Sequence, residues 1–116
     1  MTGVQTCALP ICLDFLKQVQ ALRPRVRVMP EAVSLTVIRR IVEELKPRVI
    51  AFDARDWQDE VIAVARQAEA DRFVARLGPA DQPAAWQDAI DRGATGIQTD
   101  HPAQLVEFLR ARSLHK

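Results

Sequence analysis

The chain is poor in cysteine and histidine, which limits the kinds of site it can build. Among its 116 residues are two cysteines, Cys7 and Cys12, and two histidines, His101 and His115. The cysteines lie five positions apart, the wrong spacing for a C-x-x-C redox pair, and neither histidine is near them in the sequence. Two cysteines are also too few for a disulfide framework or a zinc site. The composition therefore gives no support to a redox or zinc protein.

Excess charge and long apolar runs are absent as well. The formal net charge is +1, which gives no electrostatic argument for binding nucleic acid or an anionic membrane. The apolar runs are far too short to span a bilayer, so we expect no transmembrane segment. Glycine and proline are not enriched enough for a low-complexity chain. What remains, with 48% hydrophobic and 27% charged residues, is typical of one globular domain.

From Leu13 onward, helix and strand patterns alternate. A helical pattern that ends before Pro24 comes first, and a strand and a helix then follow each other four times. Ser34 and Asp56 are predicted N-caps of the helices that follow them. The predicted strands cover about residues 25–30, 48–54, 72–78 and 95–100, and the predicted helices about residues 13–22, 34–45, 56–70, 81–93 and 101–113.

Strands that alternate with helices over short connections predict parallel strands joined by right-handed crossovers. Two architectures fit this α/β pattern. One is a small open doubly wound sheet, and the other is the C-terminal half of a TIM (β/α)8 barrel, four parallel βα units preceded by a helix. A complete barrel has about 250 residues, so this chain is too short for a whole barrel and about right for half.

In parallel α/β folds the ligand binds at the carboxyl ends of the strands. An arginine beside carboxylates at such an edge suits a phosphate group and a divalent cation. No G-x-S-x-G, H-E-x-x-H, G-x-x-x-x-G-K or G-x-G-x-x-G motif is present. The polar residues at the predicted strand ends are Glu31, Asp53, Arg76, Gln98, Thr99 and Asp100.

These residues also have structural interpretations. Asp100 precedes a helix, where an aspartate is usually an N-cap. Glu31 and Asp53 fit solvated acids at the start of loops, and Arg76 fits a surface ion pair with Asp81. The residues alone therefore establish a parallel α/β unit with a polar rim, and they leave its chemistry open.

The segment "GATGIQTDHP", residues 93–102, resembles the C-terminal signature of the glycerophosphodiester phosphodiesterase family. In this pattern Gly93 ends a helix, Gly96 admits a tight turn into a strand, Thr99 and Asp100 emerge at the carboxyl end of that strand, and Pro102 starts the final helix. Upstream, "RPRVRVMPEA", "PRVIAFDA" and "RFVARLGPAD" resemble the fifth, sixth and seventh barrel strands. The resemblance covers about residues 13–112.

The resemblance implies an eight-stranded barrel that hydrolyses glycerophosphodiesters to glycerol 3-phosphate and an alcohol. In that family acidic residues hold a divalent cation, Ca²⁺ or Mg²⁺, and two histidines act as acid and base. These groups belong to a His-Arg-Gly, a Glu-x-Asp, a His-Asp and a later Glu with a Lys in the first half of the barrel, and none of those motifs occurs here. We therefore expect this half to carry no catalytic residue, to bind no cation and to be inactive alone.

The expected contribution of this half is to contact a small-molecule glycerophosphodiester. Ala75 and Arg76 stand where the family often carries a Trp-Thr pair, and His101 falls where the family varies, so we do not assign it as catalytic. The residues expected to touch the alcohol or glycerol part of the substrate are Glu31, Asp53, Arg76 and Gln98.

The first residues have a different origin in this interpretation. Met1–Ile11, "MTGVQTCALPI", matches one reading frame of a common short-read sequencing adapter, and the codon of Cys12 spans the junction. We expect residues 1–12 to be a non-native leader and residues 13–116 a partial phosphodiesterase domain, with the parent either cytoplasmic or exported. The alternatives are a complete small α/β ligand-binding module without catalysis and another phosphate-handling barrel.

Overall fold

In the computed structural model the backbone is described for residues 3–5 and 10–115, and the side chains for residues 13–115. The strands are β1 (Gly3–Gln5), β2 (Arg27–Met29), β3 (Glu31–Ala32), β4 (Val49–Phe52), β5 (Asp71–Ala75) and β6 (Gly96–Gln98). The helices are α1 (Pro10–Leu22), α2 (Leu35–Glu44), α3 (Asp59–Gln67), α4 (Pro83–Asp91) and α5 (Pro102–Ala111), with short 3₁₀ turns η1 (Ala54–Asp56) and η2 (Gly78–Ala80). None of the described helices is long and apolar enough to cross a membrane.

The strand pairings in the described residues are all parallel. β3, β4, β5 and β6 form one sheet in that order, and β1 pairs with β2. Pro30 separates β2 from β3, and its carbonyl accepts a hydrogen bond from the N–H of Ala51 in β4 at 2.9 Å. The chain therefore passes from β2 directly into β3 and the larger sheet. The predicted α/β fold with parallel strands is confirmed.

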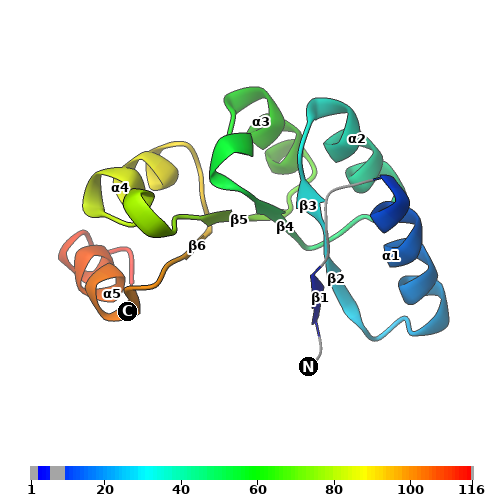
Figure 1. Ribbon diagram of the computed structural model, residues 1–116, viewed down its shortest axis with the longest axis horizontal. Coiled ribbons are helices and arrows are strands. Elements are labelled where there is room, and N and C mark those ends of the chain that lie inside the picture. Colours follow the sequence, from blue (N-terminus) through cyan, green and yellow to red (C-terminus); the bar gives the residue numbers. More distant parts are fainter. Residues whose placement is uncertain (1–2, 6–9, 116) are drawn as a thin grey trace.

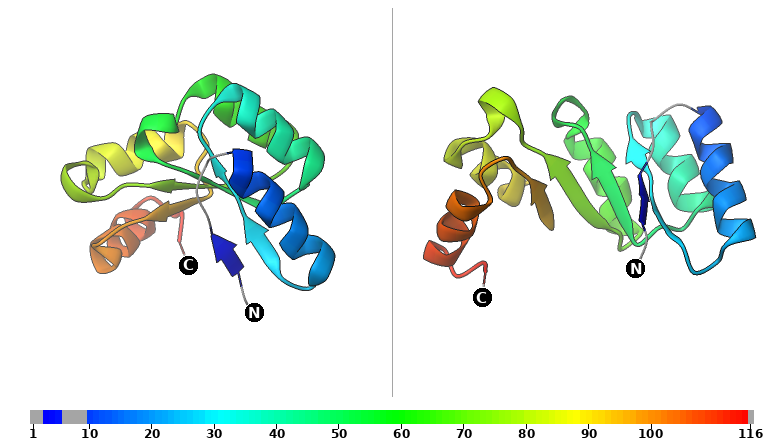
Figure 2. Two further views of the ribbon diagram at one scale, coloured as in Figure 1. Left: turned by 45° about the vertical axis from the view of Figure 1, so that its right-hand side comes forward. Right: turned by 60° about the horizontal axis from the view of Figure 1, so that its bottom comes forward.

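The helices line the outer side of the curved sheet, with α1 near one end and α5 at the other (Figure 1). Two further views show the same arc (Figure 2). A doubly wound sheet carries helices on both faces. Here the inner face of the sheet stays open, and Phe73 of β5 is 43% exposed on it. The architecture is half a TIM barrel, four parallel βα units preceded by α1.

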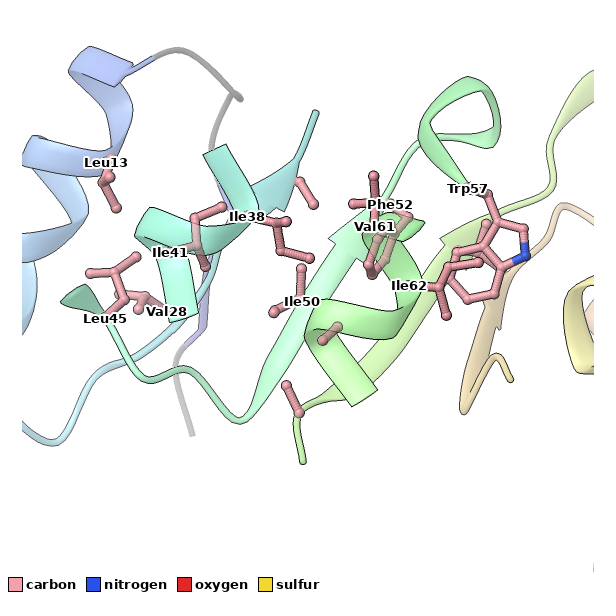
Figure 3. Packing of buried hydrophobic residues seen from close by; sticks show 14 of the residues in the cluster. Leu13, Val28, Ile38, Ile41, Leu45, Ile50, Phe52, Trp57, Val61 and Ile62 are labelled. Atoms are coloured by element: carbon pink, nitrogen blue, oxygen red, sulfur yellow. The ribbon is translucent and has the colours of Figure 1, made fainter. Parts of the chain in front are cut away.

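The hydrophobic core lies between the sheet and helices α1, α2 and α3 (Figure 3). Successive side chains of a strand point to opposite faces, so Ile50, Phe52 and Val74 face the helices and are at most 2% exposed. Helix α2 presents Ile38 and Ile41 to this layer. One face of the sheet is thus fully covered, and the other is left to line a site.

The ends of α2 follow local rules. Ser34 caps the helix as predicted, since its Oγ accepts the N–H of Val37 at 3.2 Å. This bond satisfies one of the first N–H groups, which have no partner within a helix. Beyond the other end, Lys46 has a left-handed backbone with a φ of 48°, which stops the helix before β4.

The predicted N-cap at Asp56 is wrong, because α3 begins only at Asp59. Asp56 lies in η1 instead. The reason is Trp57, which turns into the core and is 3% exposed. Its ring packs edge to face on Phe52, with 5.0 Å between the ring centroids. The helix therefore begins after Trp57, with Gln58 as its N-cap.

Strand β1 comes from the segment left out of the predicted fold. Gly3–Gln5 pairs in register with Arg27–Met29. Helix α1 begins at Pro10, three residues before its predicted start. This pairing does not test whether residues 1–12 are a non-native leader. Cys7 lies outside the described residues.

Candidate functional site

A cleft of about 480 Å³ opens at the carboxyl ends of the strands. Its polar rim comes from three strands: Glu31 begins β3, Asp53 follows β4, and Gln98 ends β6. The structure therefore brings together three of the four residues predicted to touch a substrate. The remaining lining is Met29, Ala51, Phe52, Phe73, Val74, Ala75 and Leu77.

The pleat of the strands explains which predicted residues reach the cleft. Glu31 is in register with Ala51, and Ala75 is in register with Gln98. Partners in register point to the same face of a sheet. Arg76 follows Ala75 directly, so it points to the opposite face, toward the helices.

Arg76 lies against α4 and not in the cleft. The residue is 6% exposed, and its Nη2 is 3.6 Å from Oδ2 of Asp88. Burial lowers the pKa of Arg76, and the negative charge of Asp88 opposes this effect. The predicted ion pair of Arg76 with Asp81 is wrong. Because side chains alternate along a strand, Arg76 points away from the inner face. It therefore pairs with Asp88 of α4 on the helix side of the sheet.

The carboxylates of the rim influence one another. Burial raises the pKa of Glu31, and the negative charges of Asp53 and Asp56 raise it further, against the opposing charge of Arg55. Asp53 accepts the N–H of Ala54 at 2.6 Å and pairs with Nε of Arg55 at 3.3 Å. Asp53 therefore starts its loop, as one interpretation predicted, and also lines the cleft.

Two glycines and a proline of the 93–102 motif have distinct physical roles. Gly93 follows α4 with a φ of 101°, a conformation that other residues rarely adopt. At Gly96 a side chain would overlap the ring of Phe73, which would have to move aside. Gly96 does not have the left-handed backbone that the predicted tight turn would require of a glycine. Pro102 is the first residue of α5, as predicted.

Asp81, in the loop between β5 and α4, bonds to two further residues of the motif, Thr99 and Asp100. Its carboxylate accepts hydrogen bonds from Trp86 Nε1 at 2.9 Å, Thr99 Oγ1 at 2.5 Å and the N–H of Asp100 at 2.7 Å. The predicted N-cap at Asp100 is wrong, because His101 takes the cap position of α5. Sequence reasoning missed this role of Asp81, since its partners at positions 99 and 100 are 18 and 19 residues away.

The rim by itself does not fit a divalent cation. Within the described residues, no three side chains of His, Cys, Asp or Glu come close enough together to hold a metal ion. Calcium takes six to eight oxygen ligands and magnesium about six, water included. Glu31 and Asp53 supply carboxylates from two strands only. We derive no chemical step through a cation bound to this chain.

Parallel strands, helices on the outer side and a cleft at the strand ends define a partial β/α barrel. The chain matches no protein-family model and no curated protein. A solved structure from Galdieria sulphuraria, assigned as a glycerophosphodiester phosphodiesterase, aligns with 84% of this chain and 41% of its own, at 16% identity and a TM-score of 0.70. A glycerophosphodiester phosphodiesterase from Parabacteroides distasonis aligns with 96% of this chain and 57% of its own, at 15% identity and a TM-score of 0.67.

The response regulator RcsB from Salmonella typhimurium gives a weaker match. It aligns with 97% of this chain and 60% of its own, at 19% identity and a TM-score of 0.50. At these identities the likeness establishes the fold. The chain spans about half the length of the two phosphodiesterase structures.

Proposed function

We propose that the chain is the C-terminal half of a glycerophosphodiester phosphodiesterase. Such an enzyme is a metal-dependent hydrolase of glycerophospholipid metabolism that cleaves glycerophosphodiesters to glycerol 3-phosphate and an alcohol. The observation that carries the proposal is the match of 84% and 96% of this chain to two phosphodiesterase structures, at TM-scores of 0.70 and 0.67. The segment "GATGIQTDHP" supports it from the sequence.

In this proposal the rim cleft receives the glycerol or alcohol part of the substrate. Glu31, Asp53 and Gln98 offer carboxylate and amide groups that can hydrogen-bond to hydroxyl groups. Phe73 and Leu77 supply an apolar wall beside them. Arg76 is left out of the proposed contact set, because its guanidinium is buried against Asp88.

The catalytic groups of the complete enzyme would come from the other half of the barrel. There, Ca²⁺ or Mg²⁺ would neutralise phosphate charge and histidines would move protons. The described residues contain no cluster fit for that cation. We therefore propose that this chain binds part of the substrate and does not turn it over alone.

Hydrolysis of glycerophosphocholine tests the proposal. We expect the purified chain, with Ca²⁺ or Mg²⁺ added, to release choline no faster than the buffer blank. A complete glycerophosphodiester phosphodiesterase assayed in the same buffer is the positive control. Turnover by a cooperatively folded monomer of this chain would overturn the proposal of an inactive half.

A second candidate is a complete small α/β module that binds a ligand without catalysis. The observation that favours it is the cleft of about 480 Å³, in which Glu31, Asp53 and Gln98 already form a polar rim. A stable monomer that unfolds cooperatively and binds a small polyol, with no preference for its phosphodiester, would support this candidate. A monomer that aggregates through its inner face would count against it.

A further inference from the structure

Asp81 connects three parts of the structure that are separate in the sequence. It lies between η2 and α4, and its carboxylate accepts bonds from Trp86 on α4, from the hydroxyl of Thr99 and from the backbone of Asp100, both after β6. Trp86 is 3% exposed, and its ring packs on Phe108 of α5 with 5.5 Å between the ring centroids. The carboxylate therefore ties the loop after β5 to the loop after β6 beside a buried aromatic anchor.

Both loops begin in the rim cleft. Leu77 lines the cleft and lies four residues before Asp81, and Gln98 lines it directly before Thr99. The Thr99 hydroxyl also accepts the N–H of His101 at 2.9 Å, which fixes the turn into α5. On one side Asp81 is four positions along the backbone from Leu77, and on the other side its partner Thr99 is next to Gln98.

The last ladder bond between β5 and β6, from the N–H of Arg76 to the carbonyl of Gln98 at 2.9 Å, sets the spacing of the two strands. We propose that Asp81 is a positioning residue, whose carboxylate holds together the loops that follow these strands and so shapes the mouth of the cleft beside Leu77 and Gln98. That the cleft shaped in this way receives a substrate rests on the proposed function. The positioning itself depends only on contacts within this chain.

A carboxylate suits this role better than an amide. It can accept all three bonds, whereas an asparagine side chain has one oxygen and a nitrogen that cannot accept from the N–H of Asp100. Burial opposes the charge, but the bonds from Thr99, Asp100 and Trp86 and the charge of His101 together hold the pKa of Asp81 below its usual value. The lowered pKa is consistent with three donors that converge on an ionised group.

The test compares NMR spectra of the labelled full chain carrying Asp81→Asn, Thr99→Val or Thr99→Ser. Thr99→Val removes the bond to Asp81 and the bond accepted from the N–H of His101, and it keeps the carboxylate. The test therefore does not depend on whether Asp81→Asn folds. The matched control is Asp91→Asn, whose carboxylate accepts a bond from Gln87 on the exposed side of α4. We expect Asp81→Asn and Thr99→Val to shift the Trp86 indole N–H, the Leu77 methyl groups and the Gln98 side-chain amide.

Thr99→Ser should restore the wild-type positions of these signals, and Asp91→Asn should leave them in place. The inference is overturned if the Leu77 and Gln98 signals of a folded Thr99→Val chain coincide with those of the wild type. It is also overturned if Thr99→Ser shifts them as much as Thr99→Val does. Titration of the wild type with glycerophosphocholine separates the two proposals. If Leu77 and Gln98 do not respond, the proposed substrate site fails while the positioning role of Asp81 stands.

Discussion

The pKa of Glu31 depends on the other acidic residues near the rim of the cleft. It is partly buried at the beginning of β3, on the face of the sheet that looks into the cleft. Burial raises the pKa of Glu31, and the carboxylates of Asp53 and Asp56 add to the shift. Among the described residues only the charge of Arg55 opposes this shift, so the ionised side chain destabilises the fold.

Glu31→Gln is therefore expected to stabilise the fold in a pH-dependent way. A carboxyl group with a raised pKa in the folded state stabilises folding while it is protonated, and this contribution is lost as the pH rises through the folded pKa. The thermal midpoint of Glu31→Gln should exceed that of the wild type at pH 7, and the two should converge near pH 4. Thermal unfolding followed by circular dichroism at both pH values measures this.

Glu43→Gln, on the exposed side of α2, is the matched control for removing a surface carboxylate. A midpoint for Glu31→Gln that lies below the wild type at pH 7 would contradict the assigned environment. So would a gain of the same size at both pH values.

At the scale of elements, α2 combines a defined N-cap with an apolar stripe. Its Ser34 cap is formed, and Ile38 and Ile41 face the sheet. Propensity alone rarely stabilises a helix of this length in water. The cap and the stripe together therefore fix where it begins and which face it buries.

Ser34→Ala is expected to lower the free energy of unfolding by about 1 kcal/mol, because the N–H of Val37 loses its partner. Urea unfolding at pH 7 measures this change. Ser34→Asp keeps an acceptor at the same position and should retain wild-type stability within a few tenths of a kcal/mol. If the alanine and aspartate variants unfold at the same urea concentration, the cap does not contribute as described.

Element order and parallel pairing could be predicted from the sequence, because hydrophobic periodicity and proline or glycine boundaries are local signals. The start of α3 could not be predicted from the same signals, since the buried Trp57 has a backbone conformation outside the helical region. Strand alternation, counted from Ala75, would have placed Arg76 on the helix side. Arg76 was wrongly predicted to line the cleft because residues were chosen by their place at a strand end, without regard to the face of the sheet.

The contacts of Asp81 could not be predicted from the sequence, because they are long-range. They require the loops after β5 and β6 to meet in space, across 18 and 19 residues of sequence. No local pattern around Asp81 marks it, so only the tertiary structure shows that Thr99 and Asp100 of the motif are bonded to it. Glu31, Asp53 and Gln98 could be predicted, because parallel strands bring their carboxyl ends to one edge.

For the whole molecule, the main feature is the difference between the two faces of the sheet. The outer face is covered by helices and holds fully buried side chains such as Ile50 and Val74. On the inner side Phe73 is 43% exposed and Leu77 is 40% exposed. In a closed barrel this interior is packed with side chains. Contiguous exposed apolar surface of this kind promotes association.

The double variant Phe73→Ser, Leu77→Ser is expected to reduce self-association of the chain, as measured by sedimentation velocity over a range of concentrations. The control is Phe15→Ser, Leu22→Ser, which removes exposed apolar side chains from α1, away from the inner face. The inner-face pair should lower the associated fraction clearly more than the α1 pair. Equal effects of the two pairs would show that the open inner face is not the associating surface.

We propose that the chain is the second half of a glycerophosphodiester phosphodiesterase barrel. Sequencing the genomic DNA upstream of the codon for Leu13 tests it most directly. We predict an open reading frame that continues in phase upstream and encodes the His-Arg-Gly, Glu-x-Asp and His-Asp motifs of the first half. A native start codon beside Leu13, preceded by an in-phase stop codon, would contradict the claim.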